Sequence, residues 1–303
     1  MRVLVAGGAG MIGSNIVRLL GPSAVVADVS VDGWDLRNFS VCQMAVEGMD
    51  AIYDCAARTV GIEYSSNHHG EMFYDTAAIS LNLLEAARLA NVKKYMVVSS
   101  SCVYPDWAQV PVLESDGEPG APESANLGYG WAKRFAEIQG RLYAEQYGMH
   151  VVIVRPGNVY GPSYNWANPE MHVIPSLISK MLGGDDPLTV WGSGQQTRSF
   201  LYEEDCARLM IALMEKGTRG EAYNLGGEEV SIGKLTKLLA ELCEYTGTII
   251  FDAGKPEGPA RKAQNTKKLE MLLGKALLTP LREGLQKTIE HCCPVKSRRE
   301  SVS

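Results

Sequence analysis

Four side chains that could move a proton together with a hydride are Ser100, Cys102, Tyr129 and Lys133. Tyr129 and Lys133 are spaced for one helix face in the segment YGWAK, so their side chains can meet. A phenol normally loses its proton near pH 10. A neighbouring ammonium and a positively charged nicotinamide would stabilise the phenolate and lower that pKa. Ser100 can hydrogen-bond the same substrate oxygen, and Cys102 adds a group that could take a proton from carbon.

The start of the chain determines how this set is interpreted, because Tyr129 and Lys133 alone would also fit an exposed helix face. The segment MRVLVAGGAGMIGSNIVRLL predicts a buried strand, a glycine turn and an amphipathic helix from Met11 to Leu20. Gly7 permits the turn, Gly10 lets backbone N–H groups approach a pyrophosphate, and Gly13 lets helix and strand pack closely. The helix N-terminus then faces the phosphates. We therefore expect a dinucleotide site.

An acidic residue after the second strand favours NAD over NADP. The segment SAVVADVS reaches Asp28, where a carboxylate would accept hydrogen bonds from the adenosine ribose and repel a 2′-phosphate. Arg37 could instead meet a 2′-phosphate, so both cofactors stay open, and Asp35 could reach the adenine edge. The predicted cofactor contacts are Gly7, Gly10, Met11, Ile12, Gly13, Asp28, Asp35, Leu36, Ala56 and Ala57, with Tyr129 and Lys133.

Size and composition exclude several classes of protein. The chain has 303 residues, which is enough for one large domain or two lobes, and its net charge is −6. No basic run interleaved with aromatics occurs, which argues against nucleic-acid binding. No apolar run reaches the roughly 20 residues of a membrane helix. The 7 cysteines lack metal-ligand spacing, so we expect no metal site and reduced thiols in the cytoplasm.

Strand-like and helix-like segments alternate through the first half of the chain. This alternation predicts an α/β fold with a doubly wound, parallel Rossmann-type sheet. Ser100 follows one of the strands directly, at the edge where ligands of such sheets bind. The predicted strands are Ala51–Tyr53, Tyr95–Val98 and Val151–Val154, and the predicted helices are Glu71–Ala90 and Tyr129–Tyr147.

The pattern loosens after RPGNVYGP and predicts a second, smaller unit. We assign residues 1–157 to the dinucleotide-binding domain, with its sheet completed by segments near 198–225, around Phe200 and Tyr223. Residues 158–293 would form mainly a smaller α/β lobe that binds substrate. Residues 294–303 are a polar tail.

Several motifs together resemble one enzyme family. Gly7-x-x-Gly10-x-x-Gly13, SSSCVYP, Tyr129-x-x-x-Lys133 and RPGNVYGP are similar to those of extended short-chain dehydrogenase/reductases of the NAD-dependent epimerase/dehydratase family, which modify nucleotide sugars. Within it, SSCVYP, HVIPSL and FDAGKPEGPARK resemble the GDP-L-fucose synthases (GDP-4-keto-6-deoxymannose epimerase/reductases). SNHHGEMFYDTAAIS and WGSGQQTRSF also resemble the GDP-mannose 3,5-epimerases. The resemblance runs from Met1 to about His291.

The resemblance assigns roles to matched positions. It implies catalysis by Ser100, Tyr129 and Lys133, and proton transfer at C3 and C5 of the sugar by Cys102 with His172. It implies sugar or diphosphate contacts by Asn158, Lys180, Trp191, Arg198 and Lys255. Four positions depart from the family pattern, namely Lys180 in place of a common arginine, Thr76, Asp54 and Asp28, the last because the fucose synthases use NADPH.

The chemistry fits these side chains, and ordinary structural roles fit several of them too. A C4 ketone makes the hydrogens on C3 and C5 acidic, and thiol and imidazole have pKa values near 8.5 and 6.5, suited to moving such protons. Cys102 could otherwise be a small buried residue, and His172 a capping or packed histidine. Arg198 could form a surface ion pair.

We predict a nucleotide-sugar epimerase/reductase that epimerises C3 and C5 of a 4-keto GDP-hexose and then reduces C4 with NAD(P)H. One alternative is a redox-neutral NAD-dependent epimerase, acting like GDP-mannose 3,5-epimerase or a UDP-sugar 4-epimerase. A second alternative is a catalytically inactive cofactor-binding sensor. The apolar stripes of Glu71–Ala90 and Tyr129–Tyr147 predict a homodimer through a four-helix bundle.

Overall fold

The structure is a computed structural model, and it describes residues 1–59, 61–167, 171–255 and 258–292. The predicted polar tail, 294–303, lies outside the described residues.

The centre of the molecule is a parallel sheet of 6 strands in the order β2-β1-β3-β4-β5-β9. The direction in which successive strands are added reverses at β1, because β2 pairs with one edge of β1 and β3 with the other. Ligands of such sheets bind outside the carboxyl ends of the strands at this point. The predicted doubly wound Rossmann-type fold is confirmed. The strands are β1 (Val3–Ala6), β2 (Ala24–Ala27), β3 (Ala51–Asp54), β4 (Lys94–Val98), β5 (His150–Pro156) and β9 (Ala222–Leu225).

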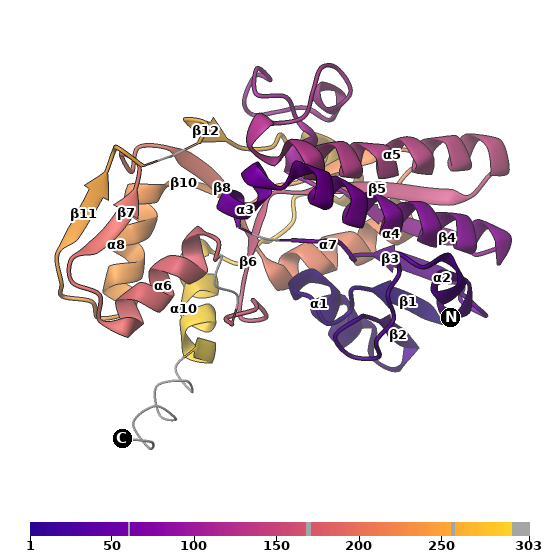
Figure 1. The fold of residues 1–303 in the computed structure, drawn as a ribbon, viewed down its shortest axis with the longest axis horizontal. Helices are drawn as coiled ribbons and strands as arrows, with labels where there is room; N and C mark the ends of the chain where they lie inside the picture. Colours follow the sequence, from indigo (N-terminus) through magenta and orange to yellow (C-terminus); the bar gives the residue numbers. More distant parts are fainter. Residues whose placement is uncertain (60, 168–170, 256–257, 293–303) are drawn as a thin grey trace.

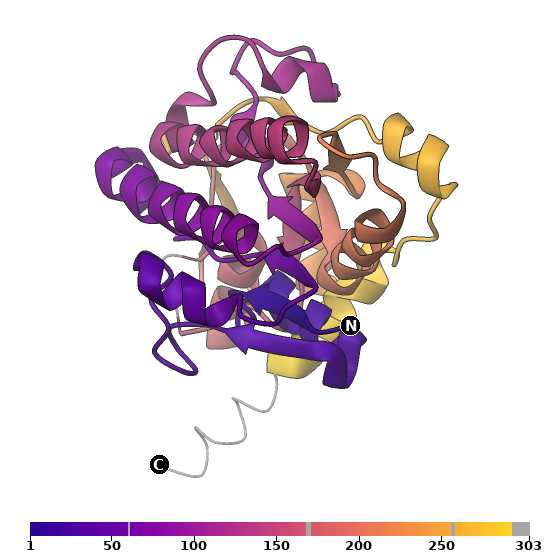
Figure 2. The ribbon, with the colours of Figure 1, turned by 90° about the vertical axis from the view of Figure 1, so that its right-hand side faces the viewer.

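Both faces of the sheet are covered by helices, which explains why its strands are mainly apolar. In β1, Leu4 and Ala6 pack into one core cluster, while Val3 and Val5 pack into another. The first cluster lies under α2 (Phe39–Ala45), α4 (His69–Leu89) and α5 (Leu127–Tyr147). The second lies under α1 (Met11–Leu20), α7 (Glu203–Lys216) and α9 (Lys267–Leu273). Figures 1 and 2 show α4 and α5 side by side on the outside of the molecule.

The predicted helices and strands of this part are present with small shifts at their ends. Helices α4 and α5 begin at His69 and Leu127, slightly before the predicted Glu71 and Tyr129. The long connection between β4 and α5 contains three 3₁₀ turns, and η1 and α3 are further short helices. Their bounds are η1 (Gly21–Ser23), α3 (Ile62–Asn67), η2 (Ser101–Val103), η3 (Glu114–Gly117) and η4 (Ser124–Asn126).

The rest of the chain forms a smaller lobe with its own core. In it β8 pairs with β10, β12 and β6, and β7 pairs with β11. Side chains of α6, α8 and α10 pack with β7 and β8 into one cluster. Figure 1 shows this lobe beside the parallel sheet. Its elements are β6 (Asn158–Tyr160), α6 (Val173–Gly183), β7 (Leu188–Trp191), β8 (Thr197–Tyr202), β10 (Glu228–Ser231), α8 (Ile232–Leu242), β11 (Ile249–Asp252), β12 (Arg261–Lys262) and α10 (Leu281–Cys292).

One detail of the predicted sheet is wrong. Tyr223 lies in β9 and completes the parallel sheet, as predicted, but Phe200 lies in β8 of the smaller sheet. There it is register-paired with Asn158 on one side and Glu228 on the other. Both segments are short and apolar, so hydrophobicity alone did not distinguish the two sheets.

Candidate active site

A cavity of about 1870 Å³ lies at the carboxyl ends of the parallel strands and extends to the smaller lobe. It brings together nearly all the residues that the sequence singled out. The predicted residues that line it are Gly7, Gly10, Met11, Ile12, Gly13, Asp28, Asp35, Leu36, Ala56, Ala57, Ser100, Cys102, Tyr129, Lys133, Asn158, His172, Trp191, Arg198 and Lys255.

The glycine turn leaves space at one end of this cavity. Gly7 has φ 70°, a left-handed conformation that glycine adopts without strain. A Cβ at Gly13 would lie 2.2 Å from the carbonyl oxygen of Gly7, so only glycine lets α1 approach the end of β1 this closely. Helix α1 therefore begins at Met11 with its N-terminus lining the cavity. This cradle fits the pyrophosphate of a dinucleotide.

Charged side chains surround the part of the cavity next to β2. Asp28 accepts a hydrogen bond from the N–H of Ala9 in the glycine turn, at 3.1 Å. The guanidinium of Arg37 is held between Asp35, at 2.7 Å, and Asp75, at 2.8 Å. Hydrogen bonds from Arg37 lower the pKa of Asp35 below its ordinary value. Arg37, the residue that could have met a 2′-phosphate, therefore already has two carboxylate partners.

Tyr129 and Lys133 lie one turn apart on α5, as their spacing predicted. The ammonium of Lys133 lies 5.6 Å from the centre of the Tyr129 ring and donates a hydrogen bond to the carbonyl of Val98 at 2.8 Å. Ser100 follows β4 by two residues, and its interaction with the Tyr129 phenol acts to lower the pKa of that phenol. Phenol, hydroxyl and ammonium thus lie together at the carboxyl edge of the sheet.

The pKa of Tyr129 is raised in the structure, whereas the sequence predicted that it would be lowered. Burial raises it above the ordinary value, and interactions with Cys102 and Asp54 act in the same direction. Hydrogen bonding to Ser100 lowers it, by less. The predicted lowering depended on the nicotinamide charge as well as on Lys133. The protein residues alone keep the proton on Tyr129.

A buried carboxyl group, Asp54, lies behind this group and was noted in the sequence only as a departure from the family pattern. It ends β3, is 1% exposed, and accepts a hydrogen bond from the hydroxyl of Tyr95 at 3.1 Å. Burial raises the pKa of Asp54, and the charge of Lys133 opposes that rise. Burial lowers the pKa of Lys133, and Asp54 opposes that fall. Each group therefore favours the charged form of the other.

Cys102 lies in the 3₁₀ turn η2, where its N–H donates to the hydroxyl of Ser100 at 3.1 Å. Burial raises the pKa of its thiol to about 12. Two charged residues that sequence reasoning missed flank it, Glu123 from the turn before α5 and Lys262 from β12. Lys262 stands in the quoted segment FDAGKPEGPARK, from which only Lys255 was selected.

His172 comes from the other side of the cavity and caps the N-terminus of α6. Its N–H donates to the hydroxyl of Tyr164 at 3.1 Å, and the two rings meet edge to face. Desolvation lowers the pKa of His172 below its ordinary value, so its imidazole is neutral at pH 7.

The smaller lobe contributes cations and an aromatic ring to the cavity. Arg198 on β8 donates to the carbonyl of Pro259 at 2.8 Å. The ammonium of Lys255 lies 5.7 Å from the centre of the Trp191 ring. Asn158 donates its side-chain amide to the carbonyl of Ser199 at 3.0 Å.

One predicted substrate residue does not reach the cavity. Lys180 lies in the last turns of α6, and its ammonium points to the carbonyl of Thr189 at 3.4 Å. It is not part of the cavity lining, so the predicted contact with substrate is not supported.

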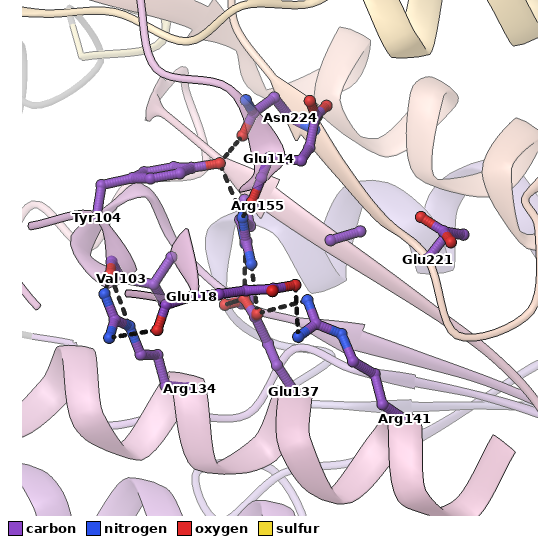
Figure 3. A network of polar contacts seen from close by, with 12 residues as sticks. Val103, Tyr104, Glu114, Glu118, Arg134, Glu137, Arg141, Arg155, Glu221 and Asn224 are labelled. Atoms are coloured by element: carbon purple, nitrogen blue, oxygen red, sulfur yellow. Dashed lines mark hydrogen bonds and ion pairs between the residues drawn. The ribbon is translucent and has the colours of Figure 1, made fainter. Parts of the chain in front are cut away.

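A buried network of polar side chains holds the turn that carries Ser100 and Cys102 (Figure 3). Arg155 makes two hydrogen bonds to Glu137, at 2.8 and 2.6 Å, and a third to the hydroxyl of Tyr104, at 3.0 Å. Ser99 donates to the same Glu137 carboxylate at 2.5 Å. Ser99 precedes the turn and Tyr104 follows it, so one ion pair anchors both of its ends.

Within the ranges that the structure describes, no three His, Cys, Asp or Glu side chains gather as a metal site would require. No helix in the same ranges has the length and hydrophobicity needed to span a membrane.

Comparison with known proteins gives a consistent result. The model of the NAD dependent epimerase/dehydratase family matches residues 3–226. GDP-L-fucose synthase of Escherichia coli is 32% identical over 89% of this chain and 90% of its own. GDP-mannose 3,5-epimerase 1 of Oryza sativa is 29% identical over 95% of this chain and 80% of its own.

A solved structure extends the similarity to three dimensions. GDP-L-fucose synthetase from Naegleria fowleri bound to NADP superposes with a TM-score of 0.86 at 25% identity. The similarity covers 97% of this chain and 94% of the other.

Proposed function

Because the chain belongs to the NAD-dependent epimerase/dehydratase family, we propose that it is a GDP-sugar epimerase/reductase. It would invert C3 and C5 of a 4-keto hexose and then reduce the ketone. The observation that carries this proposal is one cavity lined by both the Ser100, Tyr129 and Lys133 group and the pair Cys102 and His172. GDP is the nucleotide in the names of the bacterial and plant relatives.

The reduction would use the residues at the end of β4 and the start of α5. The bound dinucleotide would supply a hydride to C4, and the glycine turn from Gly7 to Gly13 would hold its phosphates. Tyr129 would donate the proton to the C4 oxygen, because burial keeps that proton on the phenol. Ser100 would orient the same oxygen, and Lys133 would stabilise the phenolate that remains.

The epimerisation would use Cys102 and His172 on opposite sides of the hexose. A hydrogen on C3 or C5 is acidic beside the ketone, so one group can remove it while the other protonates the opposite face. Ser100 and Tyr129 would stabilise the charge that develops on the C4 oxygen. Arg198 and Lys255 would bind the diphosphate, with Trp191 and Asn158 near the sugar.

Incubation with a 4-keto-6-deoxy GDP-hexose in D₂O tests the proposal. The wild-type protein should incorporate deuterium at C3 and C5 and consume reduced dinucleotide in proportion to product. Cys102→Ser and His172→Gln should lose the deuterium, and Tyr129→Phe should lose dinucleotide consumption. Absence of both reactions in the wild-type protein would refute the proposal. An inactive sensor would also bind dinucleotide but catalyse neither.

NAD is the cofactor that the residues near β2 favour. Asp28 is placed at the glycine turn, where a 2′-phosphate would meet its negative charge. Arg37 is engaged by Asp35 and Asp75, so the residue suited to a 2′-phosphate has other partners.

The preference for NAD that Asp28 and Arg37 indicate also favours a second function, that of a redox-neutral epimerase. In that reaction C4 of the sugar is oxidised first and reduced afterwards, so the dinucleotide is not consumed. A protein that turns over GDP-mannose with catalytic NAD, and does not oxidise added NADH or NADPH, would support it over the reductase.

We also propose that the protein forms a homodimer through α4 and α5. These two helices pack against each other and carry large apolar side chains on their outer surface. Leu81 is 43% exposed, Ile138 is 51% exposed and Leu142 is 54% exposed. Two helices from each of two copies would bury these side chains in a four-helix bundle.

A further inference from the structure

A buried ion pair lies against the Cys102 thiol and has no part in the reaction steps described above. The ammonium of Lys262 is 4.0 Å from the sulfur of Cys102 and 2.5 Å from the nearer carboxylate oxygen of Glu123. The side chain of Lys262 is 23% exposed and that of Glu123 is 10% exposed. Removing two charges from water is unfavourable unless they pair well, so such a pair is costly to keep for stability alone.

Three segments far apart in sequence converge on this sulfur. Cys102 lies in η2, Glu123 lies in the connection before η4, and Lys262 ends the short strand β12. The N–H of Glu123 donates to the carbonyl of Cys102 at 3.4 Å, so backbone contacts also hold the carboxylate beside the turn. Asn126 donates a further hydrogen bond to the Glu123 carboxylate.

The charged and titratable groups facing Cys102 act in different directions. Glu123 raises the pKa of the thiol in addition to burial, whereas Lys262 lowers it. Tyr129 and Lys133 face Cys102 from α5. The interaction with Cys102 raises the pKa of each of these two side chains.

Lys262 itself stays charged because of its partners. Burial disfavours its ammonium, but Cys102 and Glu123 outweigh burial and raise its pKa above the ordinary value. Arg198, which is paired in register with Lys262 on the neighbouring strand β8, acts in the opposite direction.

We propose that Lys262 and Glu123 set the acidity of Cys102 during proton exchange at the sugar. When the S–H bond breaks and a C–H bond forms, the electron pair left on sulfur lies beside the Lys262 ammonium. In the reverse step the thiol re-forms, and the proton comes from carbon. Glu123 pairs with Lys262, and the charge of its carboxylate disfavours the thiolate between these steps. The catalytic role of this pair rests on the proposed epimerisation. Its effect on the acidity of Cys102 can be tested without substrate.

The test measures alkylation of Cys102 by iodoacetamide as a function of pH, in the protein without substrate, with mass spectrometry of the labelled peptide. Only the thiolate reacts, so the rate at a fixed pH reports the thiol pKa. Lys262→Gln removes the positive charge and should slow labelling about tenfold, equivalent to one pKa unit. Glu123→Gln removes the negative charge and should accelerate labelling by a similar factor.

Controls separate a charge effect from a change in packing. Arg261→Gln removes a charge from the adjacent residue, whose partner is Glu229, and should leave the rate unchanged. Lys262→Arg should restore most of the labelling rate lost in Lys262→Gln. Cys102→Ser should lose the labelled peptide altogether.

Opposite shifts in Lys262→Gln and Glu123→Gln support the proposal, because a merely structural pair would expose the thiol in both variants and accelerate labelling in both. Shifts in the same direction, or none in either, would overturn it. Failure of the proposed function would appear separately, as a wild-type protein that neither exchanges deuterium nor reduces the 4-keto substrate.

Discussion

The phenol of Tyr129 lies among residues that keep its proton in place. Burial raises its pKa, Cys102 and Asp54 add to that rise, and the Ser100 hydrogen bond only partly offsets it. The ammonium of Lys133 lies 5.6 Å from the centre of the ring and is held by its hydrogen bond to the carbonyl of Val98. This arrangement suits the role proposed for Tyr129 as the proton donor in the C4 reduction.

Removal of the Tyr129 hydroxyl should impair C4 reduction without impairing dinucleotide binding. We expect Tyr129→Phe to lower the rate of C4 reduction by roughly 10²–10⁴-fold, the usual contribution of a positioned acid. Dinucleotide binding, measured by fluorescence titration, should change little, because the glycine turn and α1 remain intact. Reduction at the wild-type rate would contradict the assignment of Tyr129 as proton donor.

Cofactor preference should depend on the partners of Arg37. Asp75 pairs with Arg37 at 2.8 Å and with Arg58 at 2.7 Å. Asp75→Asn would release positive charge next to the adenosine end, so we expect affinity for NADP to rise relative to NAD. Titration of both dinucleotides measures this ratio, with Glu47→Gln as a charge-matched control on an exposed position. An unchanged ratio would show that Arg37 does not reach the 2′ position.

Individual site residues were predictable where a local pattern carried them. Glycine spacing identified the turn from Gly7 to Gly13, and helical spacing identified Tyr129 with Lys133. Lys262 and Glu123 have no such pattern, because their contact with Cys102 exists only after β12 docks beside β8. The pKa direction of Tyr129 depends on burial, which spacing does not report.

At the scale of elements, the turn η2 is held by its surroundings as well as by its own hydrogen bonds. The Arg155 and Glu137 pair anchors it through Ser99 and Tyr104, and α5 contacts it from the side. The buried side chains of Arg155 and Glu137 are 0% and 3% exposed. An uncompensated charge here would be unfavourable.

Breaking this pair should destabilise the protein markedly. Arg155→Met leaves the buried Glu137 carboxylate with only the longer contact to Arg141, at 3.6 Å, as an ion pair, and we expect the free energy of unfolding to fall by about 3–5 kcal/mol. Arg282→Met breaks an exposed pair with Glu241 and should cost no more than about 1 kcal/mol. Urea denaturation measures both, and equal losses would contradict the role given to burial.

Helix α5 also contacts the turn η2 at Gly130. A Cβ at Gly130 would lie 2.7 Å from the carbonyl oxygen of Cys102 and 2.6 Å from Cβ of Pro122. We expect Gly130→Ala to displace the turn, at about 1–3 kcal/mol for overpacking, and to slow deuterium exchange at C3 and C5. Gly70→Ala on α4, where a Cβ meets no atom within 4 Å, should leave exchange unchanged.

The elements themselves were predictable to different degrees. The amphipathic helix α1 and the continuous apolar strands of the parallel sheet have strong local patterns. The short strands β6, β8, β10 and β12 do not, because pairing with non-adjacent segments rather than local pattern determines their sheet. Phe200 was placed in the wrong sheet for this reason.

At the scale of the whole molecule, several large apolar side chains of α4 and α5 are exposed. Phe73 is 41% exposed and Phe135 is 40% exposed, and both lie on these two helices. Contiguous exposed apolar patches of this kind usually mark interaction sites.

Charged substitutions on this surface should prevent association. We expect the combined change Ile138→Glu and Leu142→Glu to convert a dimer into a monomer, because burying unpaired carboxylates is unfavourable. Light scattering coupled to size-exclusion chromatography measures the mass. Ile250→Glu, an equally exposed apolar position on β11 of the smaller lobe, should leave the mass unchanged. A monomeric wild-type protein would contradict the dimer.

The close packing at Gly130 also constrains how one active site could perform two reactions in succession. Thiol and phenol are carried by segments in direct contact, and the same buried salt bridge restrains the turn on its far side. We therefore expect their spacing to change little during the proposed reaction. The hexose ring would then have to pivot about its diphosphate to present C3, C5 and C4 in sequence to these groups.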